Sequence, residues 1–167
     1  MSVAVGDRLP NATLSEFIHE ESDGCPLGPK AFKVDELVSG KKIVVFALPG
    51  AFTPTCSAQH VPSYVENYDA IKARGVDEIW CISVNDPFVM NAWRIDQKVG
   101  SMIRMMADGS GEFTTKMGMV LDLTAHGLGV RSDRYVMIVE DGQVTTLDRE
   151  APGKFEVSDA ASILKKL

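Results

Sequence analysis

Cys56 has the clearest chemical potential in this sequence, because it ends the stretch Pro49-Gly-Ala-Phe-Thr53-Pro54-Thr55-Cys56. The apolar residues before Pro49 predict a strand and the spacing after Cys56 predicts a helix, so we expect the thiol on that helix's first turn. Unpaired backbone N–H groups and the positive end of the helix dipole favour a thiolate there. The pattern therefore predicts a nucleophilic sulfur.

The residues around Cys56 predict a shaped site with one reactive thiol. Thr53 precedes it by three residues and carries a hydroxyl that can donate into the same space, while Pro49 and Pro54 stiffen the chain and can shield the sulfur from water. The sequence then runs Cys56-Ser-Ala-Gln59, so the second cysteine that a dithiol oxidoreductase needs is missing. We expect single-thiol chemistry.

The cysteine usage of the chain predicts free thiols. Cys25, Cys56 and Cys81 are odd in number and have no paired metal-ligand spacing, so neither a disulfide framework nor a zinc site is indicated. We expect a cytoplasmic protein with no metal and no cofactor. Cys25 lies in a segment rich in glycine and proline, where we expect it to be exposed.

Composition limits the classes of function. The 167 residues are 45% hydrophobic, which predicts a single domain over residues 1–167. The net charge is −6, without a basic stripe, so neither nucleic acid nor an anionic membrane surface is an expected partner. The N-terminus has no signal-peptide pattern, and no apolar run is long enough to span a bilayer.

The order of predicted elements indicates the fold class. Strands alternate with helices in the first two thirds of the chain, and a β-hairpin around Asp141-Gly142 and a closing helix capped by Ser158 follow. The predicted strands cover residues 41–48, 77–84, 103–107, 135–140 and 144–147, and the predicted helices cover 55–74 with a bend at Pro62, 87–99, 111–118 and 159–167. This order predicts an α/β thioredoxin-like fold with a central mixed sheet flanked by helices, and with residues 1–40 adding edge strands.

The chain resembles the peroxiredoxins. Their active-site pattern, a proline, three residues, a threonine or serine, two residues and a cysteine, is matched by Pro49, Thr53 and Cys56. Two further motifs, Ser83-Val-Asn-Asp-Pro-Phe-Val89 and Gly127-Leu-Gly-Val-Arg131-Ser-Asp-Arg134, resemble the type II subfamily in particular. The likeness extends from about Gly6 to the C-terminus.

The resemblance implies a thiol peroxidase that reduces hydrogen peroxide and small alkyl hydroperoxides through a sulfenic acid on Cys56. It implies that Thr53 bonds the peroxide and that Arg131 lies against both the sulfur and the peroxide, because a guanidinium stays charged and donates two bonds at once. Arg134 would then only orient Arg131 or a nearby carboxylate.

The resemblance does not determine how the sulfenic acid on Cys56 is reduced back to the thiol. Cys81 is either a resolving partner for Cys56 or a buried packing residue, and the alternative reductant is glutathione with glutaredoxin, or thioredoxin. Residues 151–167 contain no cysteine, so the C-terminal resolving cysteine of animal members is missing. Similar proteins form homodimers beside the active site, which would cover Phe52, Phe88 and Trp93.

Three alternatives remain beside this interpretation. His60 lies one helical turn after Cys56, and we expect a structural role or a tuning effect on the thiol rather than a protease-like base. Oxidation of Cys56 could serve a redox sensor or signalling partner instead of a peroxidase. The chain could also be a non-catalytic thioredoxin-fold scaffold.

Overall fold

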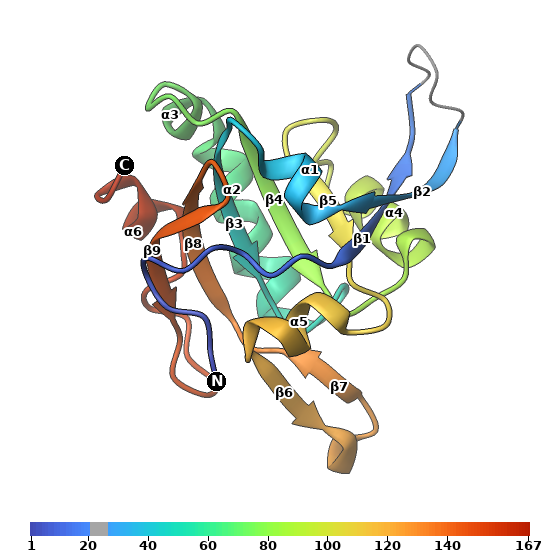
Figure 1. Ribbon diagram of the computed structural model, residues 1–167. Helices are drawn as coiled ribbons and strands as arrows, with labels where there is room; N and C mark the ends of the chain where they lie inside the picture. Colours follow the sequence, from blue (N-terminus) through green and yellow to red (C-terminus); the bar gives the residue numbers. More distant parts are fainter. Residues whose placement is uncertain (21–26) are drawn as a thin grey trace.

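The computed structural model describes residues 1–20 and 27–167, and its centre is a seven-stranded mixed sheet (Figure 1). The strand order is β2-β1-β5-β4-β3-β8-β9. Its parallel core is made of β3 (Lys42–Ala47), β4 (Glu78–Ser83) and β5 (Arg104–Ala107), and the antiparallel strands around it are β1 (Thr13–Ile18), β2 (Gly28–Lys33), β8 (Tyr135–Glu140) and β9 (Gln143–Arg149). The thioredoxin-like fold is thus confirmed; of the two N-terminal strands, β2 lies at the edge of the sheet and β1 lies between β2 and β5. Cys25 lies outside the described residues.

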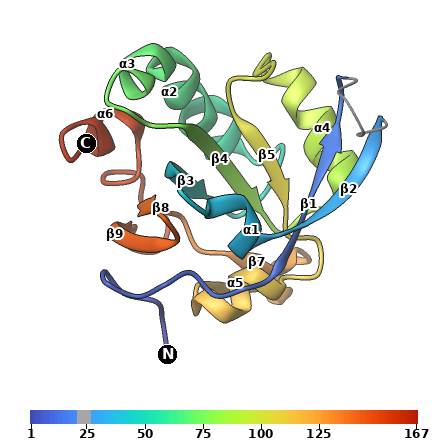
Figure 2. The ribbon, with the colours of Figure 1, turned by 45° about the horizontal axis from the view of Figure 1, so that its top comes forward.

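Helices cover both faces of this sheet (Figure 2). On one face lie α2 (Val61–Glu66), α3 (Tyr68–Lys72), α4 (Pro87–Asp96) and α6 (Ala160–Leu164), and on the other lie α1 (Val34–Val38) and α5 (Glu112–Met117). Alternate residues of each strand enter opposite cores. Val44 and Phe46 of β3 pack with the α2 side, whereas Ile43 and Val45 pack with the α1 side.

The helix predicted over residues 55–74 is present but broken into parts. A π-helical turn covers Cys56–His60, α2 follows it directly, and Asn67 separates α2 from α3. The Val61 N–H donates to the Cys56 carbonyl five residues earlier, and the next residue, Pro62, has no N–H to donate. The irregularity expected at Pro62 therefore takes the form of a widened turn that begins at Cys56.

The sequence prediction was wrong about the cap of the last helix. Asp159, not Ser158, holds the N-cap position of α6, and the Ser158 hydroxyl donates instead to Glu150 at 2.7 Å. The Glu150 carboxylate accepts both the backbone N–H and the hydroxyl of Ser158, and these charge-assisted hydrogen bonds hold the serine outside the helix.

Three elements were not expected from the sequence. They are α1, the 3-10 turn Thr124–His126, and a two-stranded arm of β6 (Val120–Leu123) and β7 (Gly129–Ser132) that extends beyond α5 (Figure 1). Each is short, and the arm pairs only with itself. No helix in the described ranges has the length and apolar character needed to cross a membrane.

Candidate active site

The sulfur of Cys56 lies in a widened helical turn at the carboxyl end of β3. The chain leaves β3 at Ala47, passes Pro49 and enters the helix at Pro54, so Cys56 lies on the first turn as expected. The residue is fully buried and packs in the core that contains Phe46. Widened turns of this kind are frequent at functional sites.

Arg134 is the residue that contacts the sulfur. Its Nη2 donates to the Cys56 Sγ at 3.2 Å, and its Nη1 donates to the Nδ1 of His60 at 2.7 Å. The guanidinium also lies over the ring of Phe155, 5.7 Å from the ring centre. A positive charge held beside a sulfur stabilises its anionic form relative to the thiol.

The register of the sheet places Arg134 there. Ala47 of β3 pairs with Tyr135 of β8, so the residue before Tyr135 lies beside the chain that leads from β3 to the active-site turn. Val136 and Ile138 face the core that contains Cys56, while Tyr135 faces the other core. Arg134 shares the alternation of Val136 and therefore points toward the sulfur.

Arg131 lies elsewhere, and this corrects the expectation that its guanidinium is placed against the sulfur. It belongs to β7, and its Nε and Nη1 donate to the carbonyl oxygens of Leu128 at 2.8 Å and Pro49 at 3.3 Å. A Cβ on Gly50 would come within 2.6 Å of the Arg131 Nη1, so a glycine is needed for this approach. Arg131 thus binds the loop that contains Pro49, and Arg134 binds the sulfur of Cys56.

Thr53 and its neighbours form a compact turn in the loop that precedes Cys56. The Thr53 hydroxyl donates to the Gly50 carbonyl at 2.7 Å, and the Ala51 N–H donates to the Asn85 side chain at 3.0 Å. The Ser83 hydroxyl donates to the same Asn85 oxygen at 2.6 Å. The motif after β4 therefore fixes the loop before Cys56, which the sequence alone did not indicate.

His60 is neutral and fully hydrogen-bonded. Its Nε2 faces the carbonyl oxygen of Ser158 at 3.1 Å and its Nδ1 faces the donating guanidinium of Arg134, so the Nε2 carries the proton and the Nδ1 accepts. Burial, and then the charge of Arg134, lowers the pKa of His60 to about 3. The Nδ1 lone pair accepts from Arg134 and the Nε2 proton is donated to Ser158, so neither ring nitrogen is free to act as a base toward Cys56, which excludes the protease-like pair.

Cys81 lies in the centre of the sheet, in the same core as Cys56. It pairs with Phe46 and Met105 of the neighbouring strands and is fully buried. Burial, and then a charge on Cys56, raises the pKa of Cys81 well above its ordinary value. Both cysteines are free, and Cys81 is held as a neutral thiol.

A cleft opens beside this cluster. Its walls come from the active-site loop, the β6 strand and the segment after β9, with Pro49, Thr55, Leu121, Arg134 and Pro152 among the lining residues. Because Arg134 and Thr55 both border it, the cleft connects the surroundings of Cys56 with the surface.

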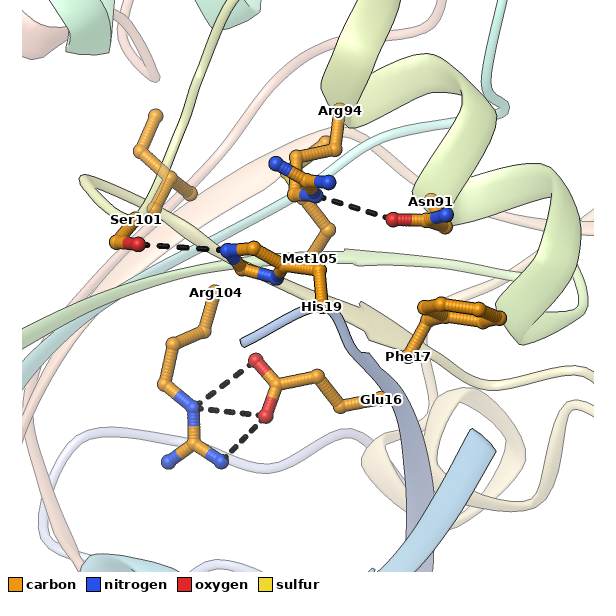
Figure 3. Close-up of a pocket in the computed structure, with 9 residues that line it drawn as sticks. Glu16, Phe17, His19, Asn91, Arg94, Ser101, Arg104 and Met105 are labelled. Atoms are coloured by element: carbon orange, nitrogen blue, oxygen red, sulfur yellow. Dashed lines mark hydrogen bonds and ion pairs between the residues drawn. The ribbon is translucent and has the colours of Figure 1, made fainter. Parts of the chain in front are cut away.

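A second cavity lies away from Cys56, between β1, α4 and β5 (Figure 3). Its polar side chains bind one another: Arg104 pairs with Glu16 at 2.7 Å, and the Ser101 hydroxyl lies 3.3 Å from the Nε2 of His19. None of the cysteines in the described part of the chain lines it. Thiol chemistry therefore belongs to the cleft beside Arg134.

Comparison with known proteins identifies the family. A family model described as Redoxin matches residues 4–164. Peroxiredoxin-2B of Arabidopsis thaliana is 47% identical over 165 residues, covering 99% of this chain and 98% of the relative. The chain belongs to the peroxiredoxin family. Its similarity to a peroxiredoxin-2 protein supports the type II subfamily, and as a peroxiredoxin it is a thiol peroxidase.

Two further proteins extend this peroxiredoxin assignment. The chloroplastic Peroxiredoxin-2E of Arabidopsis thaliana is 46% identical and aligns with 99% of this chain and 70% of its own length. Reduced Prx3 of Vibrio vulnificus, solved in complex with hydrogen peroxide, is 49% identical, with a TM-score of 0.90 over 98% of each chain. The fold around Cys56 is therefore a peroxiredoxin fold.

The neutral state of His60 predicts how stability depends on pH. Between pH 6.5 and about 3 the unfolded chain binds a proton on His60 that the folded peroxiredoxin does not bind, so the free energy of unfolding falls as pH decreases through this window. The slope from this residue approaches ~1.4 kcal/mol per pH unit. Urea unfolding of the wild type and His60→Asn at pH 7.5, 6.5 and 5.5 measures it.

The comparison stays above pH 5 because the pKa values of Glu78 and Glu150 are also lowered, and these carboxylates contribute at lower pH. His19 and His126 are present in both proteins, so their contributions cancel. A wild-type slope equal to that of His60→Asn would contradict the assignment of a neutral, buried His60.

Proposed function

We propose that Cys56 is the residue that reacts with the peroxide and that Arg134 activates it. The observation that carries the proposal is the hydrogen bond from the Arg134 guanidinium to the Cys56 Sγ. We propose hydrogen peroxide and small alkyl hydroperoxides as substrates. The hydrogen peroxide bound in Prx3 of Vibrio vulnificus supports the first of these.

In the proposed step, the Cys56 thiolate attacks the OH oxygen of the hydroperoxide ROOH. A sulfur–oxygen bond forms, the oxygen–oxygen bond breaks, and RO⁻ leaves and takes a proton from water. The sulfur loses two electrons and becomes a sulfenic acid, while the peroxide gains them and becomes an alcohol, or water when R is hydrogen. Negative charge moves from sulfur to the leaving oxygen, so a fixed cation beside both lowers the barrier.

The other site residues take supporting parts in this proposal. The Thr53 hydroxyl lies in the loop before Cys56, where it donates to the Gly50 carbonyl, and it turns toward the peroxide when the peroxide binds. Pro49 borders the cleft and keeps bulk water from the thiolate. Arg131 acts on the substrate through Pro49, whose carbonyl it binds.

We propose that the sulfenic acid is reduced by a separate thiol, either glutathione with glutaredoxin or thioredoxin. The thiol displaces water from the sulfenic sulfur and forms a mixed disulfide, which a second thiol then reduces. Complete burial and a raised pKa make Cys81 a poor nucleophile, which favours the external route. Access to the Cys56 sulfur requires local opening of the widened turn.

Free, buried thiols also support a cytoplasmic location.

Paired serine variants test the function and the route of reduction. Cys56→Ser should abolish peroxide consumption, whereas Cys81→Ser should retain turnover with glutathione and glutaredoxin or with thioredoxin. The measurement is steady-state peroxide loss with each reductant system, together with the intact mass after one equivalent of peroxide. Unchanged turnover in Cys56→Ser would overturn the proposed function.

The mass spectrum separates the two routes of reduction. A gain of one oxygen atom in wild type supports the external thiol, and a loss of two hydrogen atoms that Cys81→Ser prevents would establish Cys81 as the resolving residue instead.

We also propose that two copies of the chain associate through α4 and the active-site loop. Phe88 and Ile95 of α4 are 64% and 61% exposed, and their separation of seven residues places them on one helix face. Phe52 is 52% exposed, has a φ of 64°, and its ring lies 6.5 Å from that of the buried Trp93. Exposed apolar side chains that pack against buried core residues are typical of surfaces that a partner protein covers.

A charge on this face should separate the copies. Phe88→Glu is expected to shift the molar mass in light scattering from that of a dimer to that of a monomer, because the carboxylate would be buried without a partner. Val5→Glu, an equally drastic change at another exposed apolar residue, should leave the dimer intact. A wild-type monomer, or a dimer that Phe88→Glu leaves unchanged, would contradict the proposal.

A further inference from the structure

His60 connects Arg134 to the C-terminal segment of the chain. Its Nδ1 accepts from the Arg134 Nη1 at 2.7 Å, while the other guanidinium nitrogen, Nη2, contacts the Cys56 Sγ. A guanidinium turns about its side-chain bonds unless its N–H groups are fixed by acceptors. The Nδ1 of His60 is a fixed acceptor on the same helical turn as the sulfur, so it determines where the second nitrogen points.

The tautomer that this contact needs is set from the opposite side of the ring. The His60 Nε2 donates to the carbonyl oxygen of Ser158, which also accepts the hydroxyl of Tyr64 at 2.7 Å. A carbonyl only accepts, so the proton stays on Nε2 and the Nδ1 lone pair faces Arg134. The low pKa of His60 agrees with this arrangement, because a protonated ring would present an N–H to the guanidinium.

The Ser158 carbonyl is itself held in place. Glu150 accepts the backbone N–H groups of Glu156, Val157 and Ser158 and the Ser158 hydroxyl, at 2.7 to 3.0 Å. Burial alone would raise the pKa of Glu150, but these hydrogen bonds outweigh it and lower the pKa below its usual value. The carboxylate thus fixes the segment that sets the histidine tautomer.

Aromatic rings fix the plane of the imidazole. The ring of His60 lies between those of Phe46 and Phe155, with both ring centres 4.9 Å away. Phe155 also lies under the Arg134 guanidinium. The same aromatic side chain therefore packs against both partners of the Nδ1 hydrogen bond.

We propose that His60 is a positioning residue for peroxide reduction, whose neutral Nδ1 aims the Arg134 guanidinium at the Cys56 sulfur. This inference rests on the proposed role of Arg134. It assigns His60 no contact with the peroxide and no proton transfer. Its effect is to keep one rotational state of the guanidinium populated before the substrate arrives, so that the charge needs no reorganisation during the reaction.

Two substitutions separate this role from packing. In His60→Asn the amide Oδ1 replaces the Nδ1 as an acceptor, whereas in His60→Leu a side chain of similar bulk has no acceptor. Both variants lose the bond to Ser158, so they differ at the Arg134 contact. The measurement is the second-order rate constant for Cys56 oxidation by hydrogen peroxide, followed by tryptophan fluorescence, beside urea unfolding of each protein.

We expect His60→Leu to react about tenfold or more slowly than wild type and His60→Asn to stay within about threefold, since a hydrogen bond to a charged group is at stake. Tyr64→Phe, which removes the other bond to Ser158, should lower stability and leave the rate unchanged. In an Arg134→Ala background, His60→Leu should cause no further loss of rate.

Equal rates for His60→Asn and His60→Leu would overturn the positioning role, and so would a full additional loss in the Arg134→Ala background. If His60→Leu does not fold, His60→Ala provides the test: added imidazole should restore its rate, and pyrrole, which lacks an acceptor nitrogen, should not. Failure of imidazole to do so would also overturn the proposal. The proposed function is tested separately by Cys56→Ser, which leaves His60 and Arg134 in place.

Discussion

The contact between the Arg134 guanidinium and the Cys56 sulfur is the interaction on which the active site depends. The sulfur is fully buried in the core, and the half-buried guanidinium lies over Phe155 at the wall of the cleft. In such surroundings a fixed cation acts on a neighbouring sulfur far more strongly than it would in water. His60, Ser158 and Glu150 form a chain of hydrogen bonds behind the contact, and each of them fixes the orientation of the next.

Alternation along the strands brings these groups together. The residues of β3, β4 and β8 that face α2 include Phe46, Cys81 and Val136, and Arg134 continues the same alternation one step before β8 begins. The sheet thus places the Arg134 guanidinium and the Cys81 thiol on the same side as Cys56. The antiparallel pairing of β8 with β3 makes this possible, because the start of β8 meets the carboxyl end of β3.

The sequence predicted most of the strands and helices, but it did not predict α1 or the β6–β7 arm, and it did not place Arg134 at the sulfur. Long apolar runs and the Asp141-Gly142 turn were sufficient for β3, β4 and the hairpin, because their periods are strong and local. Two features decide which arginine reaches the sulfur: Arg134 follows the side-chain alternation of β8, which begins at Tyr135, and Arg131 belongs to the β6–β7 arm. The arm has no apolar periodicity that would have predicted it from the sequence. Ser158 does not hold the predicted N-cap position because its hydroxyl donates to Glu150, eight residues earlier in the chain. Local sequence patterns do not encode this contact.

The rate at which Cys56 reacts with peroxide, measured after each arginine is replaced in turn by lysine, decides whether Arg134 activates the sulfur. Stopped-flow oxidation of Arg134→Lys should be slower than that of wild type by about tenfold or more, because a single ammonium nitrogen cannot occupy the positions of both Nη1, which binds His60, and Nη2, which binds the sulfur. Arg131→Lys should be affected much less. Equal losses in the two variants, or a larger loss in Arg131→Lys, would contradict activation of Cys56 by Arg134.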